Sequence, residues 1–544
     1  MTLAIAGTNG LSIGSLAPAG SAGGEPDLIV ATTGRVPVDS GVYRVALRVI
    51  SSQVRSDAAV AQVRQGSVSA NGRSTALLVS LVGLDASEQQ DAVERIEEGI
   101  DPGPVRVSYG GQVATLLDAR HEVALDFWKL ELLALPLVAL IMAVAMGPRL
   151  AVAPIISAAT AIAGALAGLV ILGLVTDASL LGIAPAAVVG LVLGVEAPCA
   201  LFSRFRDEST RAPRGEAIHR AVSAAAEVAV PVGVAASLVP VGLLATSLDQ
   251  ASSMIVGCAL AVALALLSSL VCAPAAISLA HDDRHATGDA PVASWLARRP
   301  AGLTRLLARS GHRTALSLLI ATILMLAASV PLLHGQGVPF SAADLPGDSP
   351  ASMAASLAGV GKSGGGGGSL FEDLPLAAGV SAAALAVVLE IWFRSRRVTI
   401  PLAVASLLPA AAACGLCVLV FQDGHLAGAI NQETRGALDT GAVAALLAGL
   451  ASVSAARSVT VLQASRDARS PGGESSWAAG SAASLVLPGA IVATLIGAAA
   501  TGVLAGASLY AAREFGLGVA VGLLIDLVLL RSSLIAALTR REPG

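Results

Sequence analysis

Long apolar stretches separated by short polar segments make up most of the chain beyond residue 126. A helix needs about 20 apolar residues to cross the hydrocarbon core of a bilayer. Because each stretch reaches about that length, each predicts a membrane-spanning helix. The pattern predicts eleven spans, over residues 127–146, 150–174, 179–202, 218–244, 254–280, 314–333, 374–393, 399–421, 439–462, 477–503 and 507–538.

Residues 1–126 follow a different pattern, in which charged residues separate short apolar runs. β-Branched and apolar residues over 43–49, 74–82 and 105–109 predict three strands. Residues 85–100 predict an amphipathic helix with an aspartate N-cap and a glutamate-rich body. Together these elements predict a small α+β domain ahead of the membrane helices.

Composition supports a membrane protein and argues against other classes. Of all residues, 55% are hydrophobic and 13% are charged, whereas soluble chains carry roughly a quarter charged residues. A net charge of −4 gives no sign of nucleic-acid binding. The sequence contains no phosphate-binding GxxxxGK motif, no metal-ligand cluster and no catalytic triad. We therefore expect no cofactor and no enzymatic activity.

The cysteines also fit a membrane interior. All five lie in apolar stretches, and Cys414 and Cys417 form a CxxC pair inside a predicted span. Buried cysteines in such positions usually act as small packing residues. The pair therefore predicts packing rather than redox chemistry.

Arginines predict how the spans are oriented, because basic residues concentrate at the cytoplasmic ends of membrane helices. They cluster at alternate ends of successive spans, which places residues 1–126 outside the cytoplasm and the C-terminus inside it. In this orientation an outward-running span should precede the small domain. We expect either that the chain start is truncated or that the domain crosses by another route. The arginine groups are Arg149; Arg204, Arg206, Arg211 and Arg214; those between 284 and 313; Arg394, Arg396 and Arg397; Arg466 and Arg469; and Arg540 and Arg541.

The membrane part repeats itself. Arg149 and Arg396 each precede a proline by five residues at a short turn between two spans. Ser203-Arg204 and Ser465-Arg466, 262 residues apart, each end a span. Parallel repeats are typical of transporters, with the working site between them. The predicted division is an extracytoplasmic domain (1–126), a first transmembrane repeat (127–280), a cytoplasmic linker with an amphipathic helix at 295–307 (281–313), a connecting helix (314–333), an extracytoplasmic loop with a glycine-rich linker at 361–369 (334–373) and a second repeat (374–540).

Four stretches resemble the MMPL family, the mycobacterial-type lipid exporters of the resistance-nodulation-division (RND) superfamily. Residues 194–208, GVEAPCALFSRFRDE, are similar to the family's fourth helix, and residues 518–531 to its last helix. Phe393-Arg-Ser-Arg-Arg followed by Pro401 resembles a family turn. Residues 345–350, LPGDSP, resemble the entry to the second outer domain.

The resemblance implies a fold, an activity and partners. Family members have twelve spans, two outer porter domains and a proton relay inside the bilayer. Residues 25–120 resemble the first porter domain, and the second is reduced to the glycine-rich linker. The implied protein is a plasma-membrane transporter of lipid or other hydrophobic substrates, and its other partners would be the bilayer and a second copy or a related MMPL protein.

Ionisable residues deep in a span are costly and point to function. Glu196 lies seven residues before the Ser203 anchor, where the resemblance places the aspartate of the family's relay, and burial favours its neutral form. The family's neighbouring tyrosine is Ala197 here, and residues 440–466 contain no carboxylate. The alternative for Glu196 is a neutral, hydrogen-bonded carboxyl with no role in transport.

Three further residues are relay candidates. Asp526 and Arg531 match the family's last-helix aspartate and arginine, and the alternative is structural pairing near the cytoplasmic surface. Arg457 lies inside a span and either pairs with Glu196 or Asp526 or extends towards the cytoplasmic end. The other acidic residues in this region, Glu390, Asp439 and Asp249, lie at span ends and are expected to be solvated.

Two functions remain open from the sequence. The favoured one is a degenerate MMPL-type transporter that couples export to the proton gradient, as the resemblance implies, with Glu196 as shuttle. The alternative is a non-transporting membrane scaffold or partner subunit of a lipid-export complex. The missing carboxylate between 440 and 466 favours the scaffold, whereas Glu196, Asp526 and Arg531 favour proton coupling.

Overall fold

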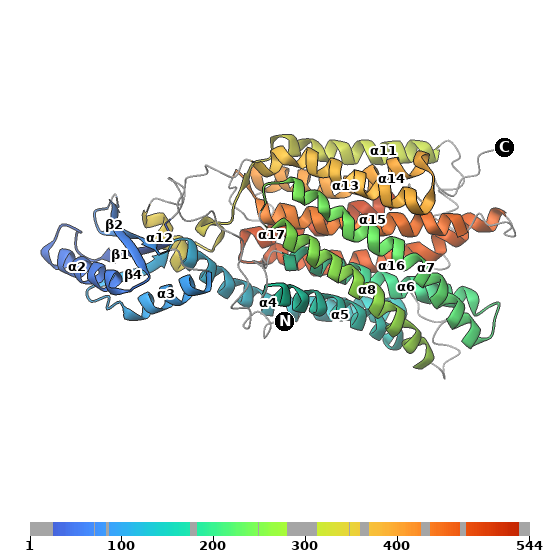
Figure 1. Ribbon diagram of the computed structural model, residues 1–544, viewed down its shortest axis with the longest axis horizontal. Coiled ribbons are helices and arrows are strands. Elements are labelled where there is room, and N and C mark those ends of the chain that lie inside the picture. The colour runs from blue at the N-terminus through green and yellow to red at the C-terminus, as the bar shows by residue number, and fades with distance from the viewer. Residues whose placement is uncertain are drawn as a thin grey trace.

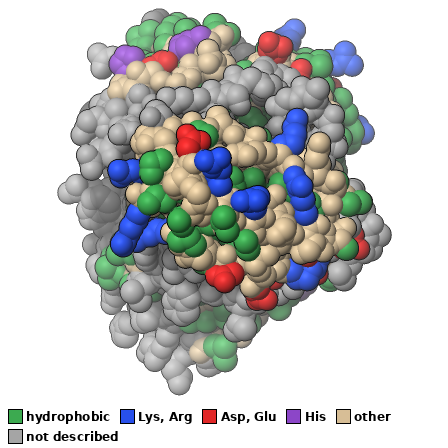
Figure 2. Space-filling view, turned by 90° about the vertical axis from the view of Figure 1, so that its left-hand side faces the viewer, with side chains coloured by type: hydrophobic (Ala, Val, Ile, Leu, Met, Phe, Trp, Pro, Cys, Tyr) green, Lys and Arg blue, Asp and Glu red, His purple; other side chains and the backbone are tan. Residues whose placement is uncertain are grey.

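The computed structural model has a bundle of long helices with a small mixed domain beyond one end (Figure 1). Seen from that end, the surface carries arginine or lysine, acidic and hydrophobic side chains side by side (Figure 2). It describes residues 26–69, 71–82, 86–173, 182–248, 250–279, 313–347, 349–358, 369–425, 436–467 and 475–531. The amphipathic helix predicted at 295–307 and most of the glycine-rich linker at 361–369 lie outside these residues.

The small domain is a four-stranded antiparallel sheet with two helices on one face. Its elements are β1 (Leu28–Gly34), α2 (Gly41–Ser56), β2 (Val60–Val68), β3 (Ser74–Leu81), α3 (Ala86–Gly99) and β4 (Val105–Gly110). The strand order β2-β3-β1-β4 and the βαββαβ chain order give a ferredoxin-like arrangement. Apolar side chains of both helices and of β1 and β3 form one core.

The predicted strand at 43–49 is wrong, because these residues belong to helix α2. Tyr43, Leu47, Ile50 and Val54 recur at helical spacing and are all buried against the sheet. Ser40 caps the helix by accepting a hydrogen bond from the backbone N–H of Tyr43. The helical period of the buried residues therefore outweighed the strand preference of the exposed valines. The strands predicted at 74–82 and 105–109 correspond to β3 and β4, and the helix predicted at 85–100 corresponds to α3.

A short helix from the loop between the two halves covers the other face of the sheet. This helix is α12 (Pro350–Ala358), and Ala354 packs against Ile29, Ala31 and Ala76. The backbone N–H of Ala351, in its first turn, donates to the Asp118 carboxylate at 2.9 Å. The segment after the first half thus fixes the small domain to the bundle.

The first half of the bundle follows the small domain without a break. Its helices are α4 (Gln112–Met146), α5 (Pro148–Gly173), α6 (Ile183–Glu208), α7 (Arg214–Leu238), the 3-10 turn η2 (Val239–Ala245) and α8 (Ala251–Leu279). Gly164 and Gly168 of α5 lie against Leu264 and Leu260 of α8, so the GxxxG spacing serves close helix packing.

The second half repeats this arrangement. It contains α11 (Arg313–Ser329), η3 (Val330–His334), β5 (Gly337–Val338), η4 (Ala342–Asp344), α13 (Ser369–Phe393), α14 (Arg396–Cys417), η5 (Val418–Gln422), β6 (Leu438–Asp439), α15 (Thr440–Asp467), α16 (Ser475–Gly502), η6 (Val503–Gly506), α17 (Tyr510–Ile525) and the π-helical turn η7 (Asp526–Arg531). Helices α5, α6 and α8 pack together, and α14, α15 and α17 form the matching group.

Eight helices of the described residues are long and apolar enough to cross a membrane. They correspond to eight of the eleven predicted spans. The other three predictions fall on α4, on α11 with η3, and on α17 with η7, which are not among these eight. The chain is therefore a multi-pass membrane protein of mostly helical fold.

The two halves meet at α6 and α15. These helices contact each other, and each also packs against a helix of the opposite half: α6 against α16, and α15 against α7. Of the eight spans found among the described residues, α15 is the most enclosed: 94% of its most apolar stretch is buried inside the protein. A polar residue on its inner face therefore meets protein rather than lipid.

The close packing of α14 on α11 predicts a large effect of a single methyl group. A Cβ added at Gly415 of α14 would overlap the carbonyl oxygen of Ala328 and lie 2.9 Å from the Cα of Ser329. We expect Gly415→Ala to lower the free energy of unfolding by about 1–3 kcal/mol, measured by denaturation in mixed micelles. Gly379→Ala on α13 is the control, because a Cβ there meets no atom within 4 Å, and an unchanged Gly415→Ala protein would contradict the packing.

Candidate functional site

The centre of the bundle holds an arginine that is completely enclosed. Arg457 lies midway along α15, and its side chain has 0% exposure. A lone guanidinium ion in an apolar interior would cost many kcal/mol, so buried charges are paired and hydrogen-bonded. The surroundings of Arg457 show how this chain meets that requirement.

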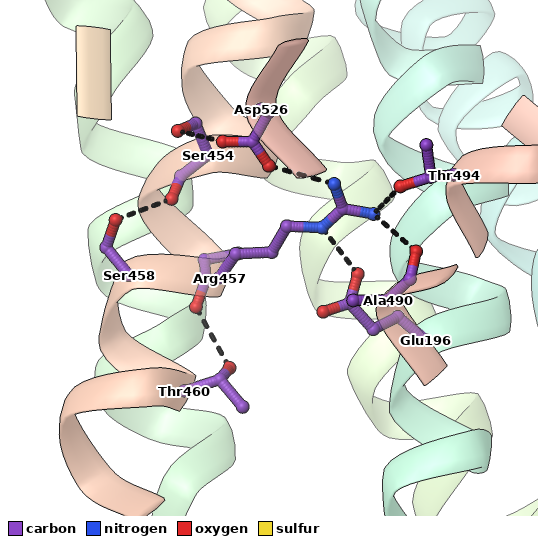
Figure 3. Close-up of polar contacts among 9 residues, drawn as sticks. Glu196, Ser454, Arg457, Ser458, Thr460, Ala490, Thr494 and Asp526 are labelled. Carbon is purple, nitrogen blue, oxygen red and sulfur yellow. Dashed lines mark hydrogen bonds and ion pairs between the residues drawn. The ribbon is translucent and has the colours of Figure 1, made fainter. Parts of the chain in front are cut away.

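Two carboxylates from different helices face Arg457 (Figure 3). Its Nε donates to Oε2 of Glu196 on α6 at 2.8 Å, and its Nη1 donates to Oδ2 of Asp526 in η7 at 2.9 Å. The side chains of Glu196 and Asp526 are 9% and 2% exposed. We call these three residues the buried charge cluster.

Helix α16 supplies two further acceptors to the guanidinium. Nη2 of Arg457 donates to the Thr494 hydroxyl at 2.9 Å and to the Ala490 carbonyl at 3.4 Å. These bonds hold the planar guanidinium in one orientation between the carboxylates (Figure 3).

A row of hydroxyl groups continues from Asp526 into the second half. Ser454 donates to Oδ1 of Asp526 at 2.8 Å. Ser458, one turn further along α15, lies 2.6 Å from the hydroxyl of Ser406 on α14 and donates to the Ser454 carbonyl. Asp526 therefore accepts from two side chains of α15, Arg457 and Ser454.

The charges of the cluster do not balance when both carboxylates are ionised. One guanidinium, which stays protonated in proteins, then faces two negative charges, and the cluster carries a net charge of −1. The buried charge cluster therefore has one carboxylate more than the guanidinium that pairs with it.

The structure brings together three of the four residues proposed from the sequence. Glu196, Arg457 and Asp526 are in direct contact, so Arg457 pairs with both carboxylates rather than extending towards the cytoplasmic end. Arg531 lies at the end of η7, and its side chain is outside the described part of the structure. Sequence reasoning missed Thr494, Ser454 and Ser458, because single hydroxyl residues are common in helices and carry no distinctive spacing.

The expectation that Asp439 is solvated is wrong. Asp439 is 3% exposed and lies just before α15, where its Oδ1 accepts from the backbone N–H of Ala442 at 2.6 Å. Its own backbone N–H donates to Glu514 on α17 at 2.9 Å. Asp439 thus caps the central helix, and a helix that begins inside the protein needs a buried cap.

The remaining predictions near the site have simple outcomes. Glu390 is half-buried and accepts from Thr399 at 3.2 Å, and Asp249 lies outside the described residues. Cys414 and Cys417 are buried free thiols. Among the residues that the structure describes, no group of three His, Cys, Asp or Glu side chains is arranged to hold a metal ion.

Comparison with known proteins gives a family match over part of the chain and a similar fold over most of it. Residues 39–303 match the model of the MMPL family. A membrane protein of Streptomyces coelicolor is 30% identical over 267 residues, which cover 46% of this chain and only 37% of that relative's length.

Solved structures of SecDF are similar in fold. A structure titled as a translocon-associated membrane protein from Thermus thermophilus has a TM-score of 0.55 at 14% identity, and SecDF in the super-membrane-facing form has 0.52 at 13%. Each match covers 94% of this chain and 84% of the SecDF chain. At this identity the similarity shows the fold of the chain.

Proposed function

We propose, from the premise that residues 39–303 belong to the MMPL family, that this chain exports a lipid or other hydrophobic substrate with energy from the proton gradient. One observation carries the proposal: the buried charge cluster lies where the two halves meet and has one carboxylate more than its single guanidinium. The hydrophobic substrate class comes from the family resemblance.

The geometry supports a link between proton binding and movement of the halves. Arg457 and Asp526 both belong to the second half, whereas Glu196 belongs to the first. When Glu196 is ionised, its ion pair with Arg457 ties α6 to α15. A proton on Glu196 removes that ion pair and leaves Arg457 paired with Asp526. Protonation thus changes the relative stability of two arrangements of the halves, as coupling requires.

The same proposal includes location and partners. The arginine pattern supports a plasma-membrane protein with residues 1–126 outside the cytoplasm and the C-terminus inside. The proposed partners are the bilayer, the hydrophobic substrate and a second copy or a related MMPL protein. The six-part division of the chain given above is part of this proposal.

The alternative is a membrane scaffold that does not transport. It is favoured by the absence of a carboxylate between 440 and 466, which leaves Arg457 as the central charge of α15. A fully paired arginine can hold two helices together without any cycle of protonation.

Transport in proteoliposomes separates the two functions. The purified full chain is reconstituted with a fluorescent phospholipid analogue, and movement of the analogue between leaflets is followed with and without an imposed pH gradient. The transporter predicts movement that depends on the gradient and stops when a protonophore is added. Movement at the rate of protein-free vesicles under every gradient would instead support the scaffold.

A further inference from the structure

A small cavity adjoins the buried charge cluster on one side. It has a volume of about 80 Å³ and lies between α6 and α15 and the helices α7 and α8. Most of its wall is apolar, and its polar residues are Glu196, Arg204, Ser269 and Thr460. The ion pair with Arg457 accounts for the buried position of Glu196, but it does not require a cavity next to the Glu196 side chain.

The cavity runs along α6 towards the end of the bundle. Glu196, Ala200 and Arg204 all line it and are spaced by four residues, so they lie on one face of the helix. Eight residues of helix correspond to about 12 Å, so the cavity reaches from the cluster to the level of Arg204. Arg204 lies near the end of α6, where the other arginines of this helix end also occur.

The volume of the cavity limits which molecules can occupy it. A buried water needs roughly 10–15 Å³ of such volume, so the cavity has room for about five waters in a row or cluster. Glu196, Thr460 and Ser269 provide polar atoms along the wall, and water molecules in a cavity need such partners.

The two carboxylates of the cluster differ in their relation to this space. Glu196 lines the cavity, whereas Asp526 is not among the described residues of its wall. Asp526 lies on the opposite side of the guanidinium, against Ser454 (Figure 3). Arg457 therefore separates a carboxylate next to the cavity from one enclosed by α14 and α15.

We propose that this cavity is a water-filled passage through which Glu196, and not Asp526, exchanges protons with the end of the bundle at Arg204. In this arrangement of the halves, a proton leaves a carboxylate oxygen of Glu196 for a water molecule of the passage, and the hydronium ion so formed releases it at the Arg204 end. The arginine pattern assigns that end to the cytoplasm. This inference rests on the proposed proton coupling and specifies the side from which one carboxylate is reached.

Thiol labelling of the full chain tests the passage without relying on transport. In a background with the five native cysteines replaced by alanine, Ala200→Cys places a thiol on the wall midway between Glu196 and Arg204. Silver ion, a membrane-impermeant thiol reagent small enough for a passage a few waters wide, is added to one side of oriented vesicles at a time, and the loss of free thiol is measured. We expect labelling at least tenfold faster from the Arg204 side than from the other side.

Matched variants make the labelling specific. Ala187→Cys is the control, because Ala187 is a half-buried alanine of the same helix outside the described cavity wall, and it should not react from the Arg204 side. Ala464→Leu places a larger side chain in the cavity from its α15 wall and should slow labelling of Ala200→Cys at least tenfold.

The outcomes separate this inference from the proposed function. Labelling of Ala200→Cys that is absent, or equal from both sides, would overturn the passage whatever the transport assay shows. One-sided labelling blocked by Ala464→Leu supports the passage, even if no proton-driven transport is found and the proposed function fails.

Discussion

Arg457→Met is expected to lower the free energy of unfolding by about 3–5 kcal/mol, the largest loss of stability predicted for a single substitution in this chain. The substitution leaves the buried side chains of Glu196 and Asp526 on either side of an uncharged methionine. Neither carboxylate keeps its positive partner, and both must then be protonated or remain as uncompensated buried charges. The measurement is equilibrium denaturation of the purified protein in mixed micelles, supported by its thermal midpoint.

Two further variants show that the loss comes from charge rather than from packing. The triple variant Glu196→Gln, Arg457→Met, Asp526→Asn removes all three charges and is expected to recover most of the lost stability. Arg466→Met, on the same helix, removes an exposed arginine that donates to the Phe393 carbonyl at 2.6 Å and lies over the Phe393 ring. We expect it to cost about 1 kcal/mol. A triple variant as unstable as Arg457→Met would contradict the charge argument.

Glu196→Gln is expected to reduce gradient-driven transport by about 100-fold, because the amide accepts no proton and transfer by a placed carboxyl contributes at least that factor. The variant keeps a side chain of the same shape beside Arg457, and the remaining pair of Arg457 and Asp526 is electrically balanced. Its stability should therefore change far less than that of Arg457→Met. The measurement is the initial rate of lipid-analogue movement in proteoliposomes under an imposed pH gradient.

The control for this variant is a carboxylate outside the cluster. Glu390→Gln removes a half-buried carboxylate at the end of α13, which accepts from Thr399 and lies 3.8 Å from Arg396. We expect its transport rate to stay within about twofold of the wild type. Wild-type, gradient-dependent rates in Glu196→Gln would remove Glu196 from the mechanism, and Asp526→Asn would then be the variant to test for the proton site.

The sequence alone determined the class of the protein and most of its helices. Apolar stretches of the length of a bilayer need no tertiary information to be recognised, because the backbone in lipid must satisfy its own hydrogen bonds as helix. Charges inside such stretches are rare, so Glu196, Arg457 and Asp526 could be named one by one. Segments of the small domain were harder: residues 43–49 favour a strand by residue type, and only burial of one helical face against the sheet made them α2.

Only the tertiary structure decided which charges meet. Glu196 and Arg457 are 261 residues apart, and nothing in either segment specifies the other as its partner. Helix α6 packs on α15, and α17, which continues into η7, packs on α15 as well. This packing places Glu196 and Asp526 within hydrogen-bonding distance of the one guanidinium of Arg457. The same packing buried Asp439 as a helix cap and left the cavity beside Glu196. Hydrophobicity is a property of each segment, whereas pairing and enclosed space depend on how segments are placed against one another.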